Sequence, residues 1–97
     1  MIATLSQAAR AMQGALHGED RQFNGVSTDT RSIRDGELFF ALQGPNFDGR
    51  DYVGAASEKG AAGAVVSRLV DEDVAQITVD DAIAALGRFG AAWRKEH

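Results

Sequence analysis

The segment 38–42 (Leu-Phe-Phe-Ala-Leu) places apolar side chains in a row between two stretches rich in glycine and polar residues. Side chains alternate between the two faces of a strand, so a strand of this composition has no polar face to turn toward water. Such a strand is typical of a sheet that helices cover on both sides. The segment therefore predicts a layered domain built around a sheet.

Apolar residues at helical spacing mark both ends of the chain. One stripe predicts a first helix over residues 5–16, with Thr4 as its N-cap. A second stripe predicts a last helix that begins at Asp80 or Asp81, where carboxylates favour the positive end of the helix dipole. The stripes consist of Leu5, Ala8, Ala9, Met12 and Leu16, and of Ile83, Leu86, Phe89 and Trp93.

Short segments between these helices complete the fold. The pattern predicts strands over residues 23–28, 64–67 and 76–79, and a helix over residues 51–59 closed by Gly60. The alternation of helices and strands predicts an α/β domain, a small mixed sheet with helices packed on it. Two strands, a helix and two strands follow one another in the middle of the chain, which leaves the strand order open.

The bulk properties exclude several classes of protein. A chain of 97 residues forms one domain, and the absence of cysteine excludes disulfides and favours the cytosol. The formal net charge of -4 argues against general nucleic-acid binding. No apolar run is long enough to span a bilayer, and the first residues lack the pattern of a signal peptide. We therefore expect a cytoplasmic domain with no nucleic-acid partner and no membrane insertion.

The sequence lacks the common signatures of catalysis and of nucleotide triphosphate binding. It contains neither a Gly-x-x-x-x-Gly-Lys-[Ser/Thr] loop nor a Gly-x-Gly-x-x-Gly fingerprint. His17 and His97 are the only histidines, and no His or Cys cluster has the spacing of metal ligands. The sequence thus predicts no catalytic residue, no metal site and no cofactor in this domain.

Two polar loops are the candidate binding site. The first follows the strand predicted over residues 23–28, and the second lies between the apolar segment and the next helix. Hydroxyls, backbone N–H groups, glycines that admit close approach and arginines that form bidentate contacts suit an anionic small molecule. The candidate residues are Ser27, Thr28, Asp29, Thr30 and Arg31, and then Gln43, Gly44, Asn46, Asp48, Gly49 and Arg50.

Structural roles for the same residues remain open. Thr28 and Thr30 cap turns in this alternative, while Asp29 and Arg31 pair with each other. Asp48 and Asp51 are expected as caps, because aspartate is favoured at that position. Arg50 either completes a phosphate clamp or is a solvated residue at the start of a helix. For Phe47 and Trp93, we expect packing in the core.

The polar loops and the segments beside them resemble the N-terminal domain of the Mur ligases. The matching segments are Thr-Asp-Thr-Arg at 28–31, Gly-Glu-Leu-Phe-Phe-Ala-Leu-Gln-Gly at 36–44, Asp-Gly-Arg-Asp-Tyr at 48–52 and Gly-Ala-Ala-Gly-Ala-Val-Val-Ser-Arg at 60–68. Within the family, residues 1–7 and the Thr-Asp-Thr-Arg form are most similar to the members that add D-alanyl-D-alanine. Arg50 departs from that pattern, since these members often carry histidine there.

The resemblance implies a division of labour between domains. Residues 1–97 would bind the UDP portion of UDP-N-acetylmuramoyl-tripeptide through the two loops, in cytoplasmic peptidoglycan precursor synthesis. ATP and Mg²⁺ would bind a central domain, and a C-terminal domain would bind the incoming amine; both are absent from this chain. The last helix ends in the charged run 94–97, which favours a boundary between domains.

Two other interpretations stay open. The chain could instead be the corresponding domain of the sister ligase that adds the third amino acid. It could also be a stand-alone module that binds a protein partner. A reading frame that continues into Gly-Lys-Thr or Gly-Lys-Ser would indicate the ligase. An exposed apolar patch around Phe89 and Trp93 would favour the module.

Overall fold

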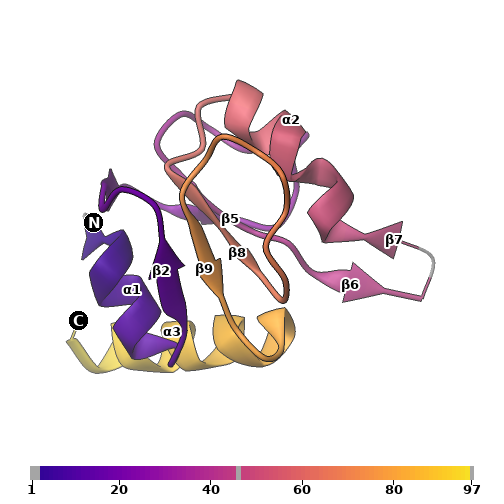
Figure 1. Ribbon diagram of the computed structural model, residues 1–97. Coiled ribbons are helices and arrows are strands. Elements are labelled where there is room, and N and C mark those ends of the chain that lie inside the picture. Colours follow the sequence, from indigo (N-terminus) through magenta and orange to yellow (C-terminus); the bar gives the residue numbers. More distant parts are fainter. Residues whose placement is uncertain (1–2, 46, 97) are drawn as a thin grey trace.

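A five-stranded sheet forms the centre of the computed structural model, which describes residues 3–45 and 47–96 (Figure 1). The strand order is β2-β9-β8-β5-β4. These strands are β2 (Ala15–His17), β4 (Val26–Ser27), β5 (Leu38–Phe40), β8 (Gly63–Val66) and β9 (Gln76–Thr78). The last four run parallel, and β2 pairs antiparallel with β9 at one edge. The predicted mixed α/β sheet is confirmed, and the open strand order is resolved.

Alternate residues of β5, together with Ala41, which follows it, pack into two separate hydrophobic clusters. Leu38 and Phe40 lie in one cluster with α1 (Leu5–Ala11) and α3 (Ala82–Glu96). Phe39 and Ala41 lie in the other cluster with α2 (Val53–Glu58). Figure 1 shows α1 and α3 on one side of the sheet and α2 on the other. The prediction that helices cover both faces of segment 38–42 is confirmed, although the strand itself ends at Phe40.

The first helix begins where the sequence predicts. Thr4 Oγ1 accepts a hydrogen bond from the Gln7 backbone N–H at 3.2 Å, and Gln7 Oε1 accepts one from the Thr4 backbone N–H at 2.9 Å. This reciprocal pair is a capping box, and it satisfies two N–H groups that the helix leaves without a partner. The predicted N-cap at Thr4 is confirmed.

The predicted end of this helix is wrong, because α1 stops at Ala11. Gln13 has a φ of 59, which takes the chain out of the helix. A Cβ on Gly14 would lie 2.7 Å from the Thr78 carbonyl oxygen, so glycine is needed where the chain crosses β9. Leu16, predicted on the helical stripe, instead lies in β2 opposite Ile77.

The strand predicted over residues 23–28 is two strands in different sheets. β3 (Gln22–Phe23) pairs antiparallel with β1 (Ala3–Thr4), whereas β4 pairs in parallel with β5. Asn24 and Gly25 separate the two, and their backbone groups bond to Gly36 and Leu38, respectively. Thr28, predicted at the strand end, consequently lies in the loop that follows β4.

The middle helix and the last two strands agree with the prediction. A 3-10 turn, η1 (Gly49–Tyr52), leads into α2, and Gly60 ends it with a φ of 91. β8 and β9 lie within one residue of the predicted bounds. A two-stranded hairpin of β6 (Gln43–Gly44) and β7 (Phe47–Asp48) precedes η1 and projects away from the sheet (Figure 1).

The face that the last helix buries overlaps only in part with the predicted one, since Phe89 and Leu86 pack against the core but Ile83 does not. Asp81 Oδ1 accepts hydrogen bonds from the backbone N–H groups of Ile83 and Ala84, which confirms the predicted start. The buried residues of the helix include Ala82, Ala85 and Phe89. Ile83, which was predicted on the apolar stripe, is 58% exposed. Leu86 is partly buried against the core, and the side chain of Trp93 lies outside the described residues. No helix in the described part of the chain is both long and apolar enough to cross a membrane.

Phe89 anchors α3, since its ring lies 5.9 Å from the rings of both Phe23 and Phe40. We expect Phe89→Ala to lower the free energy of unfolding by about 3–5 kcal/mol, because it removes a buried aromatic side chain. Ile83→Ala on the same helix is the matched control, with an expected change within about 0.5 kcal/mol. Urea denaturation measures both. A larger loss at Ile83 than at Phe89 would contradict the orientation of α3.

Candidate functional site

A cavity of about 420 Å³ lies beyond the carboxyl ends of the neighbouring parallel strands β4 and β5. Its volume falls in the range of small-molecule sites, and ligands of open α/β sheets commonly bind at this edge. The cavity thus joins the loop after β4 to the segment that follows β5. The lining residues are Thr28, Asp29, Thr30, Arg31, Phe39, Leu42, Gly49 and Tyr52.

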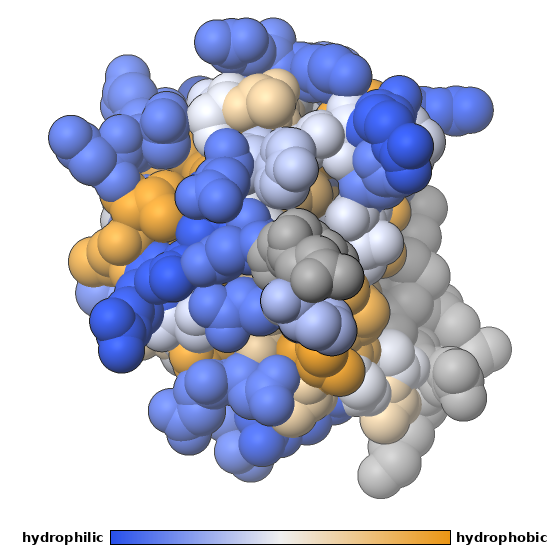
Figure 2. Space-filling model, turned by 90° about the vertical axis from the view of Figure 1, so that its right-hand side faces the viewer, coloured by the Kyte–Doolittle hydropathy of each residue, from blue (hydrophilic) through white to orange (hydrophobic). Residues whose placement is uncertain are grey.

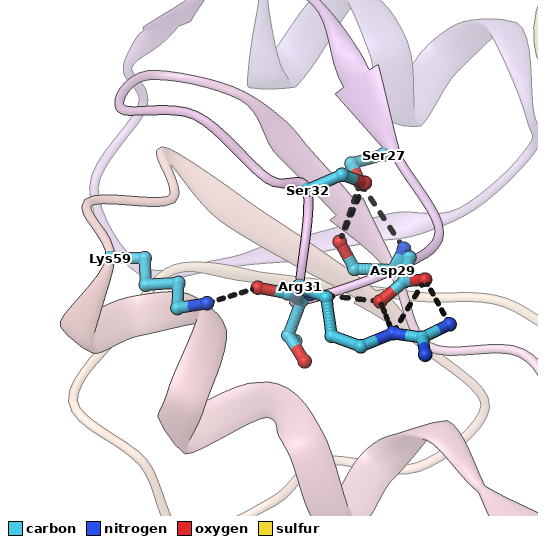
Figure 3. Close-up of polar contacts among 6 residues, drawn as sticks. Ser27, Asp29, Arg31, Ser32 and Lys59 are labelled. Atoms are coloured by element: carbon cyan, nitrogen blue, oxygen red, sulfur yellow. Dashed lines mark hydrogen bonds and ion pairs between the residues drawn. The ribbon is translucent and has the colours of Figure 1, made fainter.

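The loop after β4 is organised by hydrogen bonds within itself (Figure 3). Ser27 Oγ accepts from the Asp29 backbone N–H at 3.1 Å and donates to the Asp29 carbonyl at 2.9 Å. The same carbonyl accepts a bond from the Ser32 backbone N–H at 3.3 Å. Ser27 therefore acts on the loop and does not line the cavity.

Asp29 and Arg31 form an ion pair along the rim of the cavity. The Arg31 backbone N–H donates to Asp29 Oδ1 at 2.8 Å, and its side-chain Nη2 donates to Asp29 Oδ2 at 2.8 Å (Figure 3). Nε donates to both carboxylate oxygens at 3.1 Å. The alternative in which these two residues pair internally is thus what the structure contains, although both still line the cavity.

Asp48 and Arg50 repeat this geometry in the second loop. Arg50 N and Nε donate to Asp48 Oδ1 at 3.0 and 3.2 Å, and Nη2 donates to Asp48 Oδ2 at 2.6 Å. Asp48 is the N-cap of η1, which confirms the predicted cap. The Arg50 side chain is 27% exposed against 89% for Arg31, so the second pair is far less solvated.

The arginine partners set the ionisation of both aspartates. Hydrogen bonds from the Arg31 side chain, and next from its backbone N–H, lower the pKa of Asp29 from 3.8 to about 2. The corresponding bonds from Arg50 lower the pKa of Asp48 from 3.8 to about 2. Both carboxylates are consequently ionised throughout the physiological pH range.

The floor of the cavity comes from residues that the sequence analysis did not propose. Phe39 is buried, Leu42 is half-buried, and Tyr52 is 47% exposed beside Arg31. Phe39 and Leu42 belong to the apolar segment, whose pattern predicts core packing and gives no sign of a ligand. A Cβ on Gly49 would lie 2.5 Å from the Leu42 carbonyl oxygen, so this glycine lets the second loop close against the floor.

The structure brings only part of the predicted set together. Thr28, Asp29, Thr30, Arg31 and Gly49 line the cavity, while Asp48 and Arg50 flank Gly49 without lining it. Gly44 lies in the hairpin, and Asn46 lies outside the described residues, as does the side chain of Phe47. These placements concern geometry alone, and binding by any of these residues stays a prediction.

Gln43 lies at a second, smaller hollow of about 190 Å³. This hollow is lined by Gln43, Asp80, Asp81, Ala82 and Ile83. Figure 2 shows the side of the molecule that is on the right in Figure 1, and hydrophilic residues predominate there.

Within residues 3–45 and 47–96, no group of three or more His, Cys, Asp or Glu side chains could hold a metal ion.

Comparison with known proteins identifies the family. The profile described as "Mur ligase family, catalytic domain" matches residues 22–94. The chain belongs to the Mur ligase family. The resemblance carried by the two loops and the segments around them is therefore confirmed.

Several Mur ligases are similar to the chain in sequence. UDP-N-acetylmuramoyl-tripeptide–D-alanyl-D-alanine ligase of Escherichia coli (strain K12) is 41% identical over 93 residues, which are 96% of this chain and 20% of that protein. UDP-N-acetylmuramoyl-L-alanyl-D-glutamate–2,6-diaminopimelate ligase of Geobacter sulfurreducens (strain ATCC 51573 / DSM 12127 / PCA) is 42% identical over 83 residues, which are 79% of this chain and 16% of that protein. The chain thus spans about a fifth of the length of such relatives.

A solved Mur ligase shares the fold. The crystal structure of MurF from Acinetobacter baumannii superposes with a TM-score of 0.90 and 32% sequence identity. The match covers 99% of this chain and 22% of that one. The five-stranded sheet and its helices are consequently the fold of one part of a MurF chain.

The two ion pairs of this Mur ligase domain predict a specific response to pH. Because the folded-state pKa of each aspartate lies below its unfolded value, the pairs favour the folded state above pH of about 4 and lose that contribution as the pH falls toward about 2. We expect Arg31→Met to return the pKa of Asp29 toward 3.8 and to leave Asp48 unchanged. Arg50→Met is the reciprocal control, and the carboxyl ¹³C shifts against pH measure both. Titration of both aspartates near 4 in the unaltered chain would contradict the ion pairs.

Proposed function

We propose that this chain is the UDP-substrate-binding N-terminal domain of an ATP-dependent, amide-forming Mur ligase. The full-length ligase would add D-alanyl-D-alanine to UDP-N-acetylmuramoyl-tripeptide in cytoplasmic peptidoglycan precursor synthesis. The observation that carries this proposal is the cavity at the ends of β4 and β5, which combines an apolar floor with a rim of hydroxyls and a guanidinium. An apolar floor suits a nucleobase, and the rim suits ribose and diphosphate.

In this proposal, Arg31 binds the diphosphate and keeps its carboxylate partner. Its Nε and Nη2 donate to Asp29, and Nη1 makes no hydrogen bond among the described residues. Nη1 can therefore donate to an anion in the cavity while Asp29 fixes the orientation of the guanidinium. Thr28 and Thr30 would supply hydroxyl contacts to the ribose or the phosphates.

Two relatives that match nearly the whole of this chain favour the D-alanyl-D-alanine-adding ligase over its sister. Relatives of the first kind match 96% of this chain in Escherichia coli (strain K12) and Bacillus subtilis (strain 168), and 79% in Synechocystis sp. (strain ATCC 27184 / PCC 6803 / Kazusa). Relatives named as 2,6-diaminopimelate ligases match 70–79% of it, at comparable identity. The sister ligase is the second candidate, and it would use the same UDP site.

The domain would contribute binding energy at a distance from the reaction. By holding the UDP end of the substrate, it would position the peptide carboxylate for chemistry in the other domains. ATP and Mg²⁺ are proposed to bind the central domain, beyond residue 97, and not this one. The remaining partners are then the central and C-terminal domains of the same protein.

Titration of the chain with UDP tests the binding role. We expect the backbone amide signals of residues 27–31, 43–44 and 46–50 to shift at millimolar UDP, while those of α1 on the other face of the sheet stay in place; residue 45 is proline and has no amide N–H. Arg31→Met is expected to weaken UDP binding by about tenfold, because it removes a charge-assisted hydrogen bond. Arg10→Met removes the same charge from the exposed side of α1 and serves as the matched control. Unchanged loop signals at millimolar UDP would overturn the site.

The division of labour makes a separate prediction for ATP. We expect no phosphate release from ATP and Mg²⁺ by this chain, with or without UDP, because its sequence has no loop that holds the triphosphate in the P-loop manner. A phosphate-release assay measures this outcome. Sustained turnover that co-purifies with the folded chain would contradict the placement of ATP in another domain.

A further inference from the structure

The cavity rim depends on one contact from outside its own loop. Ser27 belongs to the sheet, but the polar contacts of Asp29, Arg31 and Ser32 join residues of segment 27–32 to one another. Lys59 Nζ donates to the Thr30 carbonyl at 2.6 Å, across 29 residues of sequence (Figure 3). Among the side-chain hydrogen bonds of the described residues, it is the one that joins segment 28–31 to an element other than the adjoining strand β4.

Lys59 extends from a fixed point of the fold. It is the C-cap of α2, and its backbone N–H donates to the carbonyls of Ala55 and Ala56 at 3.2 and 3.1 Å. The next residue, Gly60, ends the helix, and its carbonyl accepts a bond from the Gly36 backbone N–H at 2.8 Å. The backbone under Lys59 is thus held by a helix and by a neighbouring loop, so its ammonium can hold the rim in place.

We propose that Lys59 is a positioning residue of the nucleotide site, and this inference rests on the proposed function. Its ammonium fastens the Thr30 carbonyl to α2 and so keeps Thr28, Asp29 and Arg31 along the cavity. Lys59 is exposed and does not line the cavity, which distinguishes it from a residue that contacts the ligand. No substrate atom is required to touch it.

Positioning and direct phosphate contact predict different ligand dependence. A residue that shapes the rim affects every ligand that the rim holds, including uridine, which carries no phosphate. A residue that pairs with phosphate affects UDP and leaves uridine binding unchanged. Arg31→Met is the internal reference for the second behaviour, since Arg31 is proposed to contact the diphosphate.

The experiment compares Lys59→Met, Lys59→Arg and the charge control Arg10→Met in the 97-residue chain. We expect Lys59→Met to weaken UDP and uridine by the same factor, about threefold to tenfold, because one hydrogen bond to the rim is lost. The midpoint of thermal unfolding is expected to stay close to that of the unaltered chain, because the contact is at the surface. Lys59→Arg keeps a cationic donor and is expected to restore binding of both ligands, whereas Arg10→Met leaves both affinities unchanged.

The inference would be overturned by wild-type affinities in Lys59→Met, by a loss of affinity confined to UDP, or by a failure of Lys59→Arg to restore binding. A readout without ligand separates this inference from the proposed function. Loss of the fastening is expected to speed hydrogen exchange at the Arg31 and Ser32 amides, whose acceptors lie in Asp29. If the unaltered chain binds neither UDP nor uridine, the proposed function is wrong. If the Arg31 and Ser32 amides exchange equally fast in Lys59→Met and in the unaltered chain, the hydrogen bond from Lys59 does not hold the loop in place.

Discussion

The burial of β5 on both faces is the constraint on which the rest of this structure depends. Leu38 and Phe40 point into the cluster with α1 and α3, and Phe39 and Ala41 point into the cluster with α2. One short strand therefore joins two cores, and it lies between β4 and β8 in the sheet. Because Phe39 also forms the floor of the cavity, the same packing that stabilises the domain fixes the base of its candidate site.

The end of that strand determines where the polar loops meet. β4 and β5 are parallel and adjacent, so the chain leaves both strands at the same edge of the sheet. The loop after β4 carries Asp29 and Arg31, while the chain after β5 reaches the site again at Gly49. Two loops that are separated in sequence thus line one cavity. The motifs predicted the N-terminal fold of the Mur ligases, and the family match and the solved structure agree with that prediction.

Local patterns predicted the elements well where a short segment is bounded by glycine or polar residues, as in β5, β8 and α2. They were wrong where tertiary contacts outweigh local preference. Leu16 continues the apolar stripe of the first helix, yet the chain leaves the helix at Gln13 and Gly14, and Leu16 lies in β2. Ile83 is exposed, because the last helix turns Ala82, Ala85 and Phe89 toward the core. The loops were recognisable as polar and glycine-rich, but Tyr52 and Lys59 could not be assigned to the site. Their roles depend on which elements pack together, and no local pattern encodes that.

The charges around the cavity show how an acidic chain could suit the anionic ligand proposed for it. The formal net charge is -4, but electrostatic interactions are screened over about 8 Å at physiological salt, so nearby groups matter most. Arg31, Arg50 and Lys59 gather near the cavity, and two of the three hold their positions through the aspartates two residues before them. Each aspartate offsets part of the positive charge, yet it also orders a flexible side chain before any ligand arrives. A preorganised guanidinium loses less conformational entropy on binding, so these ion pairs can support affinity although they reduce the net positive charge of the site.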